Sequence, residues 1–414
     1  MSSSIAVSTP QVVAGATRRA AWFEQRRTWV LGWLVAAGWA GSFLVISNLT
    51  THRTWGTMAA VAYLAAALVA GTGRRRASVA VALIGAVALP LGWLVLTGRA
   101  QPEVAVMERS MELMLHTGSP YAAHPHGLAD YNPYLPGQAL FGLPHALGLL
   151  GPLGDARLWC AGFLALCLSA GRAVLRSAPA PAAGASSYGI SYGTAVGALV
   201  ASPFLALPLC VSGIDIPLIG VCCVAPALAL RNRPMAAGLV LAFACTLKWT
   251  AWPVVPVVLA AVFALYGLGA ALRCAAVTLG GAGAVILPFA LRTPKTMLEQ
   301  VFLFPTGHGA VATPAKSPLP GVLLSELGTP GLAVAGVLLL VGAVALTVSL
   351  VKRPPVDFVA CADRLALGLA IAFALAPASR FGYFALPAVL VLWTRLAVRC
   401  DGSQPWWGLR RQVG

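Results

Sequence analysis

The feature of this sequence that most constrains its fold is a series of apolar runs, each about as long as a membrane is thick. A helix of about 20 apolar residues crosses a hydrocarbon core of roughly 30 Å, and within lipid every backbone polar group has to be paired inside its own segment. Hydrophobic residues make up 59% of the 414 residues and charged residues only 10%, a balance that excludes a soluble globular domain. The sequence therefore predicts an all-α polytopic membrane protein and not a barrel of short alternating strands.

Clusters of basic residues between the apolar runs predict how the chain crosses the membrane. Lysine and arginine gather on the cytoplasmic side, and the strongest such cluster is Arg74, Arg75 and Arg76. Because the net charge of +16 is spread over these clusters, with no basic face on a soluble domain, nucleic acid is not an expected partner. The pattern predicts a bundle of about twelve transmembrane helices with both termini inside. The predicted spans are 28–47, 55–71, 79–96, 158–175, 190–209, 216–230, 235–247, 253–268, 274–291, 332–351, 365–377 and 381–396.

The spans and loops divide the chain into a transmembrane module, two preceding helices and two tails. The nine cysteines form no C-x-x-C pair and lie mostly in apolar runs, where they are expected to pack as small buried side chains. The predicted parts are an N-terminal cytoplasmic tail 1–27, two additional transmembrane helices 28–77, a module 78–398 with outer loops 98–155 and 292–329, and a C-terminal cytoplasmic tail 399–414.

The first outer loop carries a large share of the acidic side chains. Four of the 12 acidic residues fall within residues 100–154 of this loop, namely Glu103, Glu108, Glu112 and Asp130. Residues 102–116 have helical periodicity, with apolar side chains on one side and Glu108 and Glu112 one turn apart on another. This pattern predicts a helix lying at the membrane interface. Residues 133–150 are apolar but interrupted by proline and glycine, and they predict a second juxtamembrane helix.

Carboxylates beside cations at the membrane surface suit the transfer of a sugar from a lipid phosphate. The reactive carbon of such a donor lies at the interface, a carboxylate takes the proton of the acceptor hydroxyl, and cations neutralise the departing phosphate. Outer cations at Lys248, Arg292 and Arg380 are candidates for that second task. His124 and His126 have a spacing compatible with a metal, but no third ligand accompanies them, so no metal site is expected.

The loop sequence PEVAVMERSMELMLHTGSPY, followed by YNPYLPGQALFGLP, resembles the first outer loop of bacterial GT-C glycosyltransferases. It is most similar to glycosyltransferase family 87, the polyprenyl-phosphate-mannose-dependent mannosyltransferases of actinobacterial type. In that family an acid precedes G-x-x-Y and then Y-x-P. Glu103 stands where the catalytic aspartate usually stands, with Gly118, Tyr121 and Tyr134 in order behind it. The resemblance runs from about Val79, and it departs from the family in having glutamate for aspartate and two helices before the usual first one.

The resemblance implies a catalytic residue and a substrate-binding set. Glu103 would be the general base, Lys248 and Arg380 would hold the donor phosphate, and His308 in the second outer loop resembles a histidine that the family brings toward the catalytic acid. The predicted substrate-binding residues are Arg109, Glu112, Tyr121, Asp130, Tyr134, Lys248, His308 and Arg380. No cofactor and no metal is implied. Several of these residues also fit structural roles. Asp130 fits a helix cap, Lys248 a snorkelling side chain, Arg109 a partner of an acid or a lipid headgroup, and Glu112 a solvated helix face.

The resemblance implies that the protein transfers a hexose from a polyprenyl-phosphate-linked sugar donor to a glycan or glycolipid acceptor. Mannose is the hexose that the family resemblance favours. The protein would span the bacterial plasma membrane many times, with its active site on the extracytoplasmic face. An arabinose donor fits the same scaffold chemically. A transporter or flippase of lipid-linked sugars is the alternative, and it would place ionisable groups at mid-membrane depth and show paired broken helices. A structural scaffold without chemistry is a third reading, which leaves the acids of the first loop unexplained.

Overall fold

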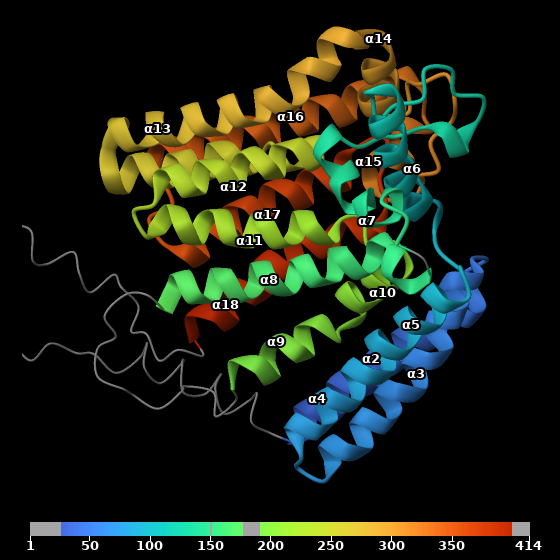
Figure 1. Ribbon diagram of the computed structural model, residues 1–414. Coiled ribbons are helices and arrows are strands. Elements are labelled where there is room, and N and C mark those ends of the chain that lie inside the picture. Colours follow the sequence, from blue (N-terminus) through green and yellow to red (C-terminus); the bar gives the residue numbers. More distant parts are fainter. Residues whose placement is uncertain (1–25, 150, 177–190, 400–414) are drawn as a thin grey trace, which may run out of the picture. The chain divides into compact units, whose positions relative to one another are not determined.

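The computed structural model (Figure 1) describes residues 26–149, 151–176 and 191–399. Most of both predicted tails, and the whole of the segment 177–187 between two predicted spans, lie outside these residues. The described elements are helices, together with one isolated β-bridge between Lys316 and Ser379. The predicted all-α class is confirmed.

The chain forms two compact units, and the first contains the N-terminal helices. It comprises Met1–Leu89, Pro179–Pro203 and Leu396–Gly414, with the described helices α2 (Arg26–Ile46), α3 (Thr50–Gly71), α4 (Arg75–Leu83), η1 (Ile84–Ala88) and α9 (Tyr192–Val200). Buried indole groups tie these helices together. Trp33 Nε1 donates to Ser78 Oγ at 2.7 Å, and Trp55 Nε1 donates to the carbonyl of Ala86 at 2.9 Å. These polar groups are thereby paired inside apolar surroundings, as burial requires.

The second unit is a bundle of apolar helices formed by Pro90–Ala178 and Phe204–Arg395. Its helices are most of α5 (Leu89–Leu96), α10 (Pro203–Val211) and α18 (Ala385–Arg399), and all of α8 (Ala156–Arg176), α11 (Ile216–Leu230), α12 (Pro234–Leu247), α13 (Val254–Arg292), α16 (Thr329–Lys352) and α17 (Phe358–Leu375). α11 packs against both α8 and α12 and is buried along nearly its whole length. Glycine permits this packing, since a Cβ added at Gly220 would lie 2.9 Å from Cys167 Cβ.

Eight described helices are long and apolar enough to cross a membrane, or nine when α9 and α10 are one interrupted span. The interruption falls within the predicted span 190–209, ahead of Pro203. One of the eight, Trp249–Arg292, is 44 residues long and contains Gly267 at φ 79° and ψ 179°, where its two limbs fold back along each other (Figure 1). The second limb of this helix adds one crossing, and the shorter apolar helices α11 and α12 add two. The number of possible crossings among the described residues thus rises from nine to twelve. This number agrees with the prediction of about twelve crossings.

Short helices gather at one end of the bundle of the second unit (Figure 1). They are α6 (Pro102–Thr117), α7 (Leu143–Ala146), α14 (Pro294–Met297) and α15 (Pro320–Ser325). The connecting turns are η2 (Leu128–Asp130), η3 (Pro136–Gly142), η4 (Gly151–Gly154), η5 (Trp249–Ala251), η6 (Leu298–Leu303) and η7 (Phe381–Phe384). α6 begins with Pro102, and Gly118, whose φ of 71° is left-handed, caps its C-terminal end. It confirms the helix predicted for 102–116.

The second juxtamembrane helix predicted for 133–150 is wrong. The segment forms η3 and α7 in its place, and a proline is the first residue of η3 and the second residue of α7. Pro136 and Pro144 lack the N–H that a continuous helix would need at those points. η3 is also largely buried. It lies so close to α6 that a Cβ added at Gly142 would be 2.3 Å from the carbonyl oxygen of Met107. Most residues of η3 therefore pack on protein, whereas Leu140, Leu147 and Leu149 of the same segment are exposed.

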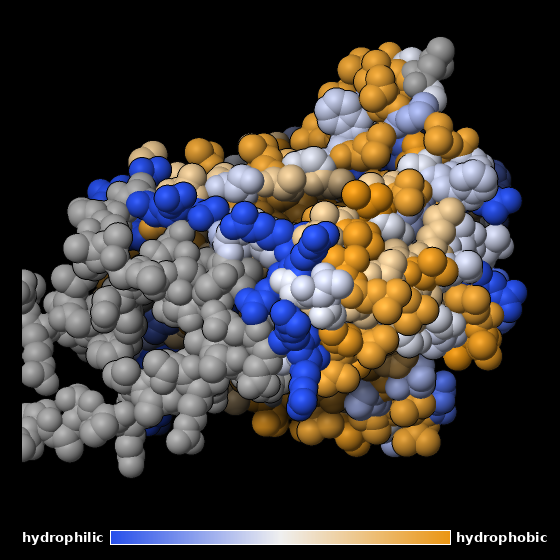
Figure 2. Space-filling model, turned by 90° about the horizontal axis from the view of Figure 1, so that it is seen from below, coloured by the Kyte–Doolittle hydropathy of each residue, from blue (hydrophilic) through white to orange (hydrophobic). Residues whose placement is uncertain are grey.

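Many large apolar side chains lie on the described surface. On the face in Figure 2, hydrophobic side chains occupy most of the area that is not grey, and hydrophilic side chains gather in limited patches. Val45, Leu68 and Leu291 are 83, 77 and 79% exposed. In water such surfaces would favour association, whereas lipid is the solvent that apolar helices of this length are suited to.

Candidate functional site

The centre of the candidate site is an ion pair between Glu103 and Arg380. Glu103 lies in the first turn of α6, directly after Pro102, where the helix dipole favours a carboxylate. Arg380 Nη1 donates to Glu103 Oε1 at 2.5 Å, although the two residues are 277 positions apart. The other oxygen, Glu103 Oε2, is buried and has no hydrogen-bond partner among the described residues. The carboxylate is thus held by one oxygen and retains accepting capacity on the other.

A second ion pair, between Lys248 and Asp215, lies beside the first. Lys248 follows α12 in an extended conformation, and its Nζ donates to Asp215 Oδ1 at 2.8 Å. The ammonium lies over the ring of Tyr383, 4.5 Å from the centroid, and 5.7 Å from the ring centroid of Tyr134. The charges of both pairs act on Tyr134. Two carboxylates and two cations therefore meet at helix ends around two tyrosine rings.

Backbone packing places Tyr134 beside Lys248. The N–H of Leu135 donates to the carbonyl of Leu247 at 3.0 Å, which joins the residues next to that tyrosine and that lysine. η3 lies so close to α12 that a Cβ added at Gly137 would lie 2.2 Å from a threonine Oγ1 of that helix. Glycine is required here because a side chain would separate the two elements.

Buried polar side chains connect the first outer loop to its neighbours. Gln138 Nε2 donates to the sulfur of Met107 at 3.3 Å and to the carbonyl of Ile214 at 3.1 Å, so it joins η3 to α6 and to the turn before α11. The hydroxyl of Tyr121 donates to the carbonyl of Tyr134 at 3.0 Å. Since each of these groups is buried and paired, the loop has a defined conformation.

The second outer loop packs against the first through Gln300 and Glu299. Gln300 is fully buried, accepts from the N–H of Asn132 at 3.0 Å and donates to the carbonyl of Ala122 at 2.8 Å. Glu299 Oε1 accepts from the hydroxyl of Tyr131 at 3.2 Å. The two predicted outer loops thus form one polar layer.

The segment that carries Arg380 is fixed by the same layer. The N–H of Ser317 donates to the carbonyl of Ser379 at 3.0 Å, and the N–H of Phe381 donates to Ser317 Oγ at 3.2 Å. Arg380 itself is extended, with φ −129°. Bonds on both sides of the arginine therefore direct its side chain.

Burial and neighbouring charges both shift pKa values at the site. Burial acts to lower the pKa of Lys248, but Asp215 and other neighbours outweigh it, so this pKa stands above its usual value. Burial also acts to lower the pKa of Arg380, and Glu103 outweighs it. Burial, followed by Glu103 and Asp215, raises the pKa of Tyr134. Both cations stay charged, and the phenol stays neutral, at physiological pH.

Four of the predicted site residues meet in this cluster. They are Glu103, Tyr134, Lys248 and Arg380. Tyr121 lies next to them in an apolar cluster that includes Leu135 and Val301. Its contact with the cluster is the bond to the Tyr134 carbonyl, which makes it a support for that residue.

Arg109 and Asp130 lie in a different part of the first loop. Asp130 Oδ2 accepts from the N–H of His126 at 2.9 Å, and this bond, with a smaller contribution from the Arg109 charge, lowers the pKa of Asp130. Asp130 thus stabilises the loop between α6 and η3. Nη2 of Arg109 is buried and has no hydrogen-bond partner in the described chain. Their substrate-binding roles stay predictions.

Glu112 and His308 also take positions outside the cluster. Glu112 Oε1 lies 3.4 Å from Nε2 of His145. His308 is exposed, and its ring hydrogen-bonds to Thr306 at 3.3 Å. Within the described residues no contact joins His308 to Glu103, so the predicted approach of the histidine to the acid is not seen and its role stays a prediction.

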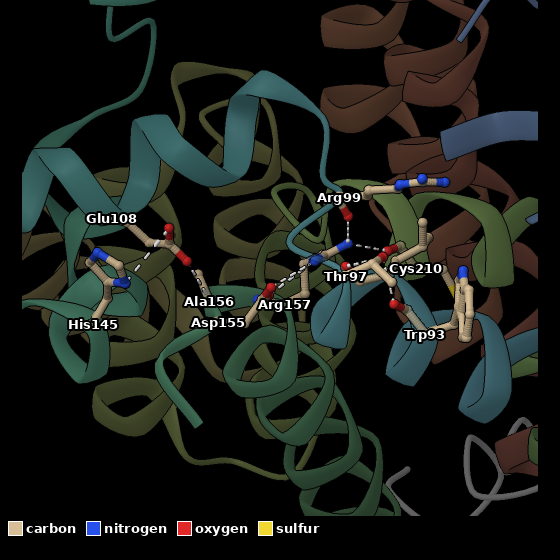
Figure 3. Close-up of polar contacts among 10 residues, drawn as sticks. Trp93, Thr97, Arg99, Glu108, His145, Asp155, Ala156, Arg157 and Cys210 are labelled. Carbon is tan, nitrogen blue, oxygen red and sulfur yellow. Dashed lines mark hydrogen bonds and ion pairs between the residues drawn. The ribbon is translucent and has the colours of Figure 1, made fainter. Parts of the chain in front are cut away.

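Glu108 takes part in a second polar group on α6 (Figure 3). Its Oε1 accepts from the N–H of Ala156, the first residue of α8, at 3.2 Å, and its Oε2 lies 3.9 Å from Nδ1 of His145. Burial raises the pKa of Glu108, while the Ala156 N–H and His145 act to lower it. This acid is therefore committed to a helix terminus and a histidine.

The sequence assigned no role to Asp215 or Tyr383. Asp215 lies in a two-helix turn and directly precedes an apolar helix, in a chain with only 12 acidic residues. Tyr383 follows Arg380 by three positions, in the turn η7. The scarcity of acids was the available signal for the first, and the neighbouring arginine was the signal for the second.

Among the described residues, no group of three or more His, Cys, Asp or Glu side chains could hold a metal ion.

Comparison with known proteins gives a limited result. No protein-family profile and no curated protein matches the chain. The chain is similar to two crystal structures of ArnT from Cupriavidus metallidurans. The apo structure has a TM-score of 0.49 and 18% identity over 80% of this chain and 62% of that chain. The structure bound to undecaprenyl phosphate has a TM-score of 0.49 and 19% identity over 80% and 61%. The chain thus spans about three fifths of their length.

Proposed function

We propose that this chain is a membrane glycosyltransferase of the GT-C class. It would move a hexose, mannose by the sequence resemblance, from a polyprenyl-phosphate donor to a glycan or glycolipid on the extracytoplasmic side of the bacterial plasma membrane. The observation that carries the proposal is the pairing of Glu103 with Arg380 beside Lys248, at helix ends, with one oxygen of Glu103 buried and unpartnered.

The cluster supplies the groups that this reaction requires. The acceptor oxygen forms a bond to the anomeric carbon, the bond from that carbon to the phosphate oxygen breaks, and its electron pair stays on the lipid phosphate. Glu103 takes the acceptor proton as general base. Arg380 and Lys248 stabilise the negative charge of the leaving phosphate.

Donor binding would exchange partners at the site. Arg380 donates to Glu103, and Lys248 donates to Asp215. A phosphate oxygen that takes Arg380 as its partner leaves Glu103 free for the acceptor hydroxyl. The same cation would thus mask the base until the donor is bound.

The test is sugar transfer by the purified full chain in lipid vesicles, with labelled polyprenyl-phosphate mannose and a lipid extract as acceptor. Glu103→Gln is expected to lower the rate by about 10²–10⁴-fold, the contribution of a general base. The matched control is Glu326→Gln, an exposed acid of the second outer loop outside the cluster. Full transfer by Glu103→Gln contradicts the proposal.

The transporter or flippase alternative predicts a different product. It would move the lipid-linked sugar between leaflets without releasing a polyprenyl phosphate. Its ionisable groups would lie at mid-membrane depth, whereas Lys248 and Arg380 directly precede the candidate spans Trp249–Arg292 and Phe381–Val398. Movement of intact donor with no released phosphate would favour the alternative.

A further inference from the structure

Arg157 is a fully buried arginine in the first turn of α8. Its Nε and Nη2 donate to the two carboxylate oxygens of Asp155 at 2.9 and 2.6 Å. Its Nη1 donates to the carbonyls of Arg99 at 3.0 Å and Cys210 at 2.8 Å (Figure 3). A buried cation is tolerated only with such a full set of partners. The carbonyls of Arg99 and Cys210 show what Arg157 connects, because they lie before α6 and in α10, whereas the arginine lies in α8.

The two carbonyls lie in the segments that lead to the two acids of the site. Just beyond them, the N–H of Gln101 donates to the carbonyl of Val211 at 2.9 Å, so the two segments are joined side by side. α6 begins after the first segment and carries Glu103 in its first turn. α11 begins after the second, and Asp215 directly precedes it. Arg157 therefore links the backbones on which both acids depend.

The turn before Asp215 also rests on Arg157. Gly213 has a φ of +70°, and a Cβ added there would lie 3.1 Å from Arg157 Cγ and 3.2 Å from its Cα. The N–H of Ile216 donates to the carbonyl of Gly213 at 3.1 Å, which closes the turn. A Cβ at this position fits only if the turn and the arginine move apart by a few tenths of an ångström, and it is strained at this φ, so the turn rests closely on Arg157.

We propose that Arg157 is a positioning residue that sets the distance between Glu103 and Asp215, and with it the distance between the base and the phosphate-binding cation Lys248. The inference rests on the proposed function, in which that distance decides the rate. Group transfer requires the base and the leaving group at a fixed separation, and an error of about 1 Å costs about 10²-fold. The cations would still bind phosphate individually, so the loss falls on kcat more than on KM.

A matched control exists at another place in the same unit. Arg395 Nη1 and Nη2 donate to the two oxygens of Asp363 at 2.7 and 2.9 Å. This pair has the chemistry of Arg157 with Asp155, but it joins α17 to α18 and contacts neither of the segments that lead to the site acids. Because the Arg395 side chain is 34% exposed and Arg157 is fully buried, this control reports the loss of arginine–carboxylate hydrogen bonds, and the thermal transition of Arg157→Lys reports the cost at the buried pair.

The experiment compares Arg157→Lys with Arg395→Lys in steady-state transfer from polyprenyl-phosphate mannose. Arg157→Lys is expected to lower kcat by about tenfold or more, with the donor KM changed by less than about threefold. Arg395→Lys is expected to change either constant by less than about threefold. In a Glu103→Gln background, Arg157→Lys is expected to cause no further loss, because a misplaced base and an absent base are not additive.

An unchanged kcat in Arg157→Lys, or an equal further loss in the Glu103→Gln background, overturns the proposal. If Arg157→Lys loses its thermal transition, Gly213→Ala decides, since it displaces the turn before Asp215 without changing any charge. The same fall in kcat at constant KM is expected there, and an unchanged kcat overturns the proposal. Failure of the proposed function is read separately, from full transfer by Glu103→Gln alone.

Discussion

Two regions of the helix α6 carry glutamates in very different surroundings. Glu103 pairs with Arg380 and keeps one buried oxygen without a partner in the described chain. Five residues further on, Glu108 accepts from the first N–H of α8 and lies near His145. Five residues turn a helix by about 140° beyond one full turn, so the two carboxylates face different neighbours. The partners, and not the residue type, decide which glutamate has chemistry left to do.

The largest expected difference between the two regions is in catalytic rate. Glu103→Gln removes the proton acceptor and is expected to lower kcat by about 10²–10⁴-fold. Glu108→Gln keeps the shape of a residue that caps a helix, and it is expected to lower kcat by less than about tenfold. Initial rates of both variants in vesicles measure the difference. Equal losses of kcat in the two variants would contradict the assignment of Glu103 as the general base.

Lys248, the second cation of the candidate site, is expected to act on donor binding. The double variant Lys248→Met/Asp215→Asn removes the second ion pair without leaving an unpaired acid. The loss of one charge-assisted contact to phosphate, about 1.5–3 kcal/mol, raises the donor KM by roughly 10–100-fold. The control is the double variant of the pair Arg395 and Asp363. A donor KM that does not change would remove Lys248 from the phosphate site.

The contact of η3 with α6 is expected to affect stability. A Cβ added at Gly142 would lie 2.3 Å from the Met107 carbonyl oxygen and 2.8 Å from Glu108 Cα, which are backbone atoms that cannot move aside. Gly142→Ala is therefore expected to lower the free energy of unfolding by about 1–3 kcal/mol. Thermal melting in detergent measures it. Gly127→Ala is the control, since nothing lies within 4 Å of its added Cβ, and an equal Tm shift there would contradict the packing argument.

The smallest expected effect is the pH dependence of stability at Glu108. Burial raises the pKa of Glu108 above its usual 4.5, so the folded state favours the protonated form. The stability that this group contributes is present below its usual pKa and is lost as the pH rises through the folded-state pKa. Glu108→Gln stays neutral, and it should gain stability relative to the wild type as the pH rises above the usual glutamate pKa of 4.5.

Melting curves at several pH values check this sign. The control is Glu112→Gln, whose side chain is 45% exposed, against 17% for that of Glu108. A gain of equal size in the control, or a relative loss for Glu108→Gln with rising pH, would contradict burial as the cause.

Apolar periodicity predicted the helices well but not the shape of the loops. The span predicted for 216–230 coincides with α11, because an uninterrupted apolar run has no alternative in lipid. The stretch 133–150 has similar composition, but Pro136 and Pro144 divide it into short turns, of which η3 is buried against α6 and α12. Hydropathy does not distinguish a lipid-facing surface from a protein-facing one.

The candidate site was predictable where its residues carry a motif. Glu103, Tyr134, Lys248 and Arg380 could be named because a family resemblance marked them, and the structure brings them together. Arg157 could not be named in this way. It stands at the edge of an apolar run, where a sequence suggests a side chain at the membrane surface, and its partners are backbone carbonyls. Such partners leave no trace in residue types.

The most direct test of the account is the binding of a polyprenyl phosphate to Glu103→Gln, measured beside its transfer rate. If Glu103 competes with phosphate for Arg380 and then acts as the base, the variant loses transfer while its Kd for polyprenyl phosphate stays within about threefold of the wild type or becomes lower. A Kd that rises in step with the loss of transfer would contradict the account, because Glu103 would then serve only to hold Arg380 in place.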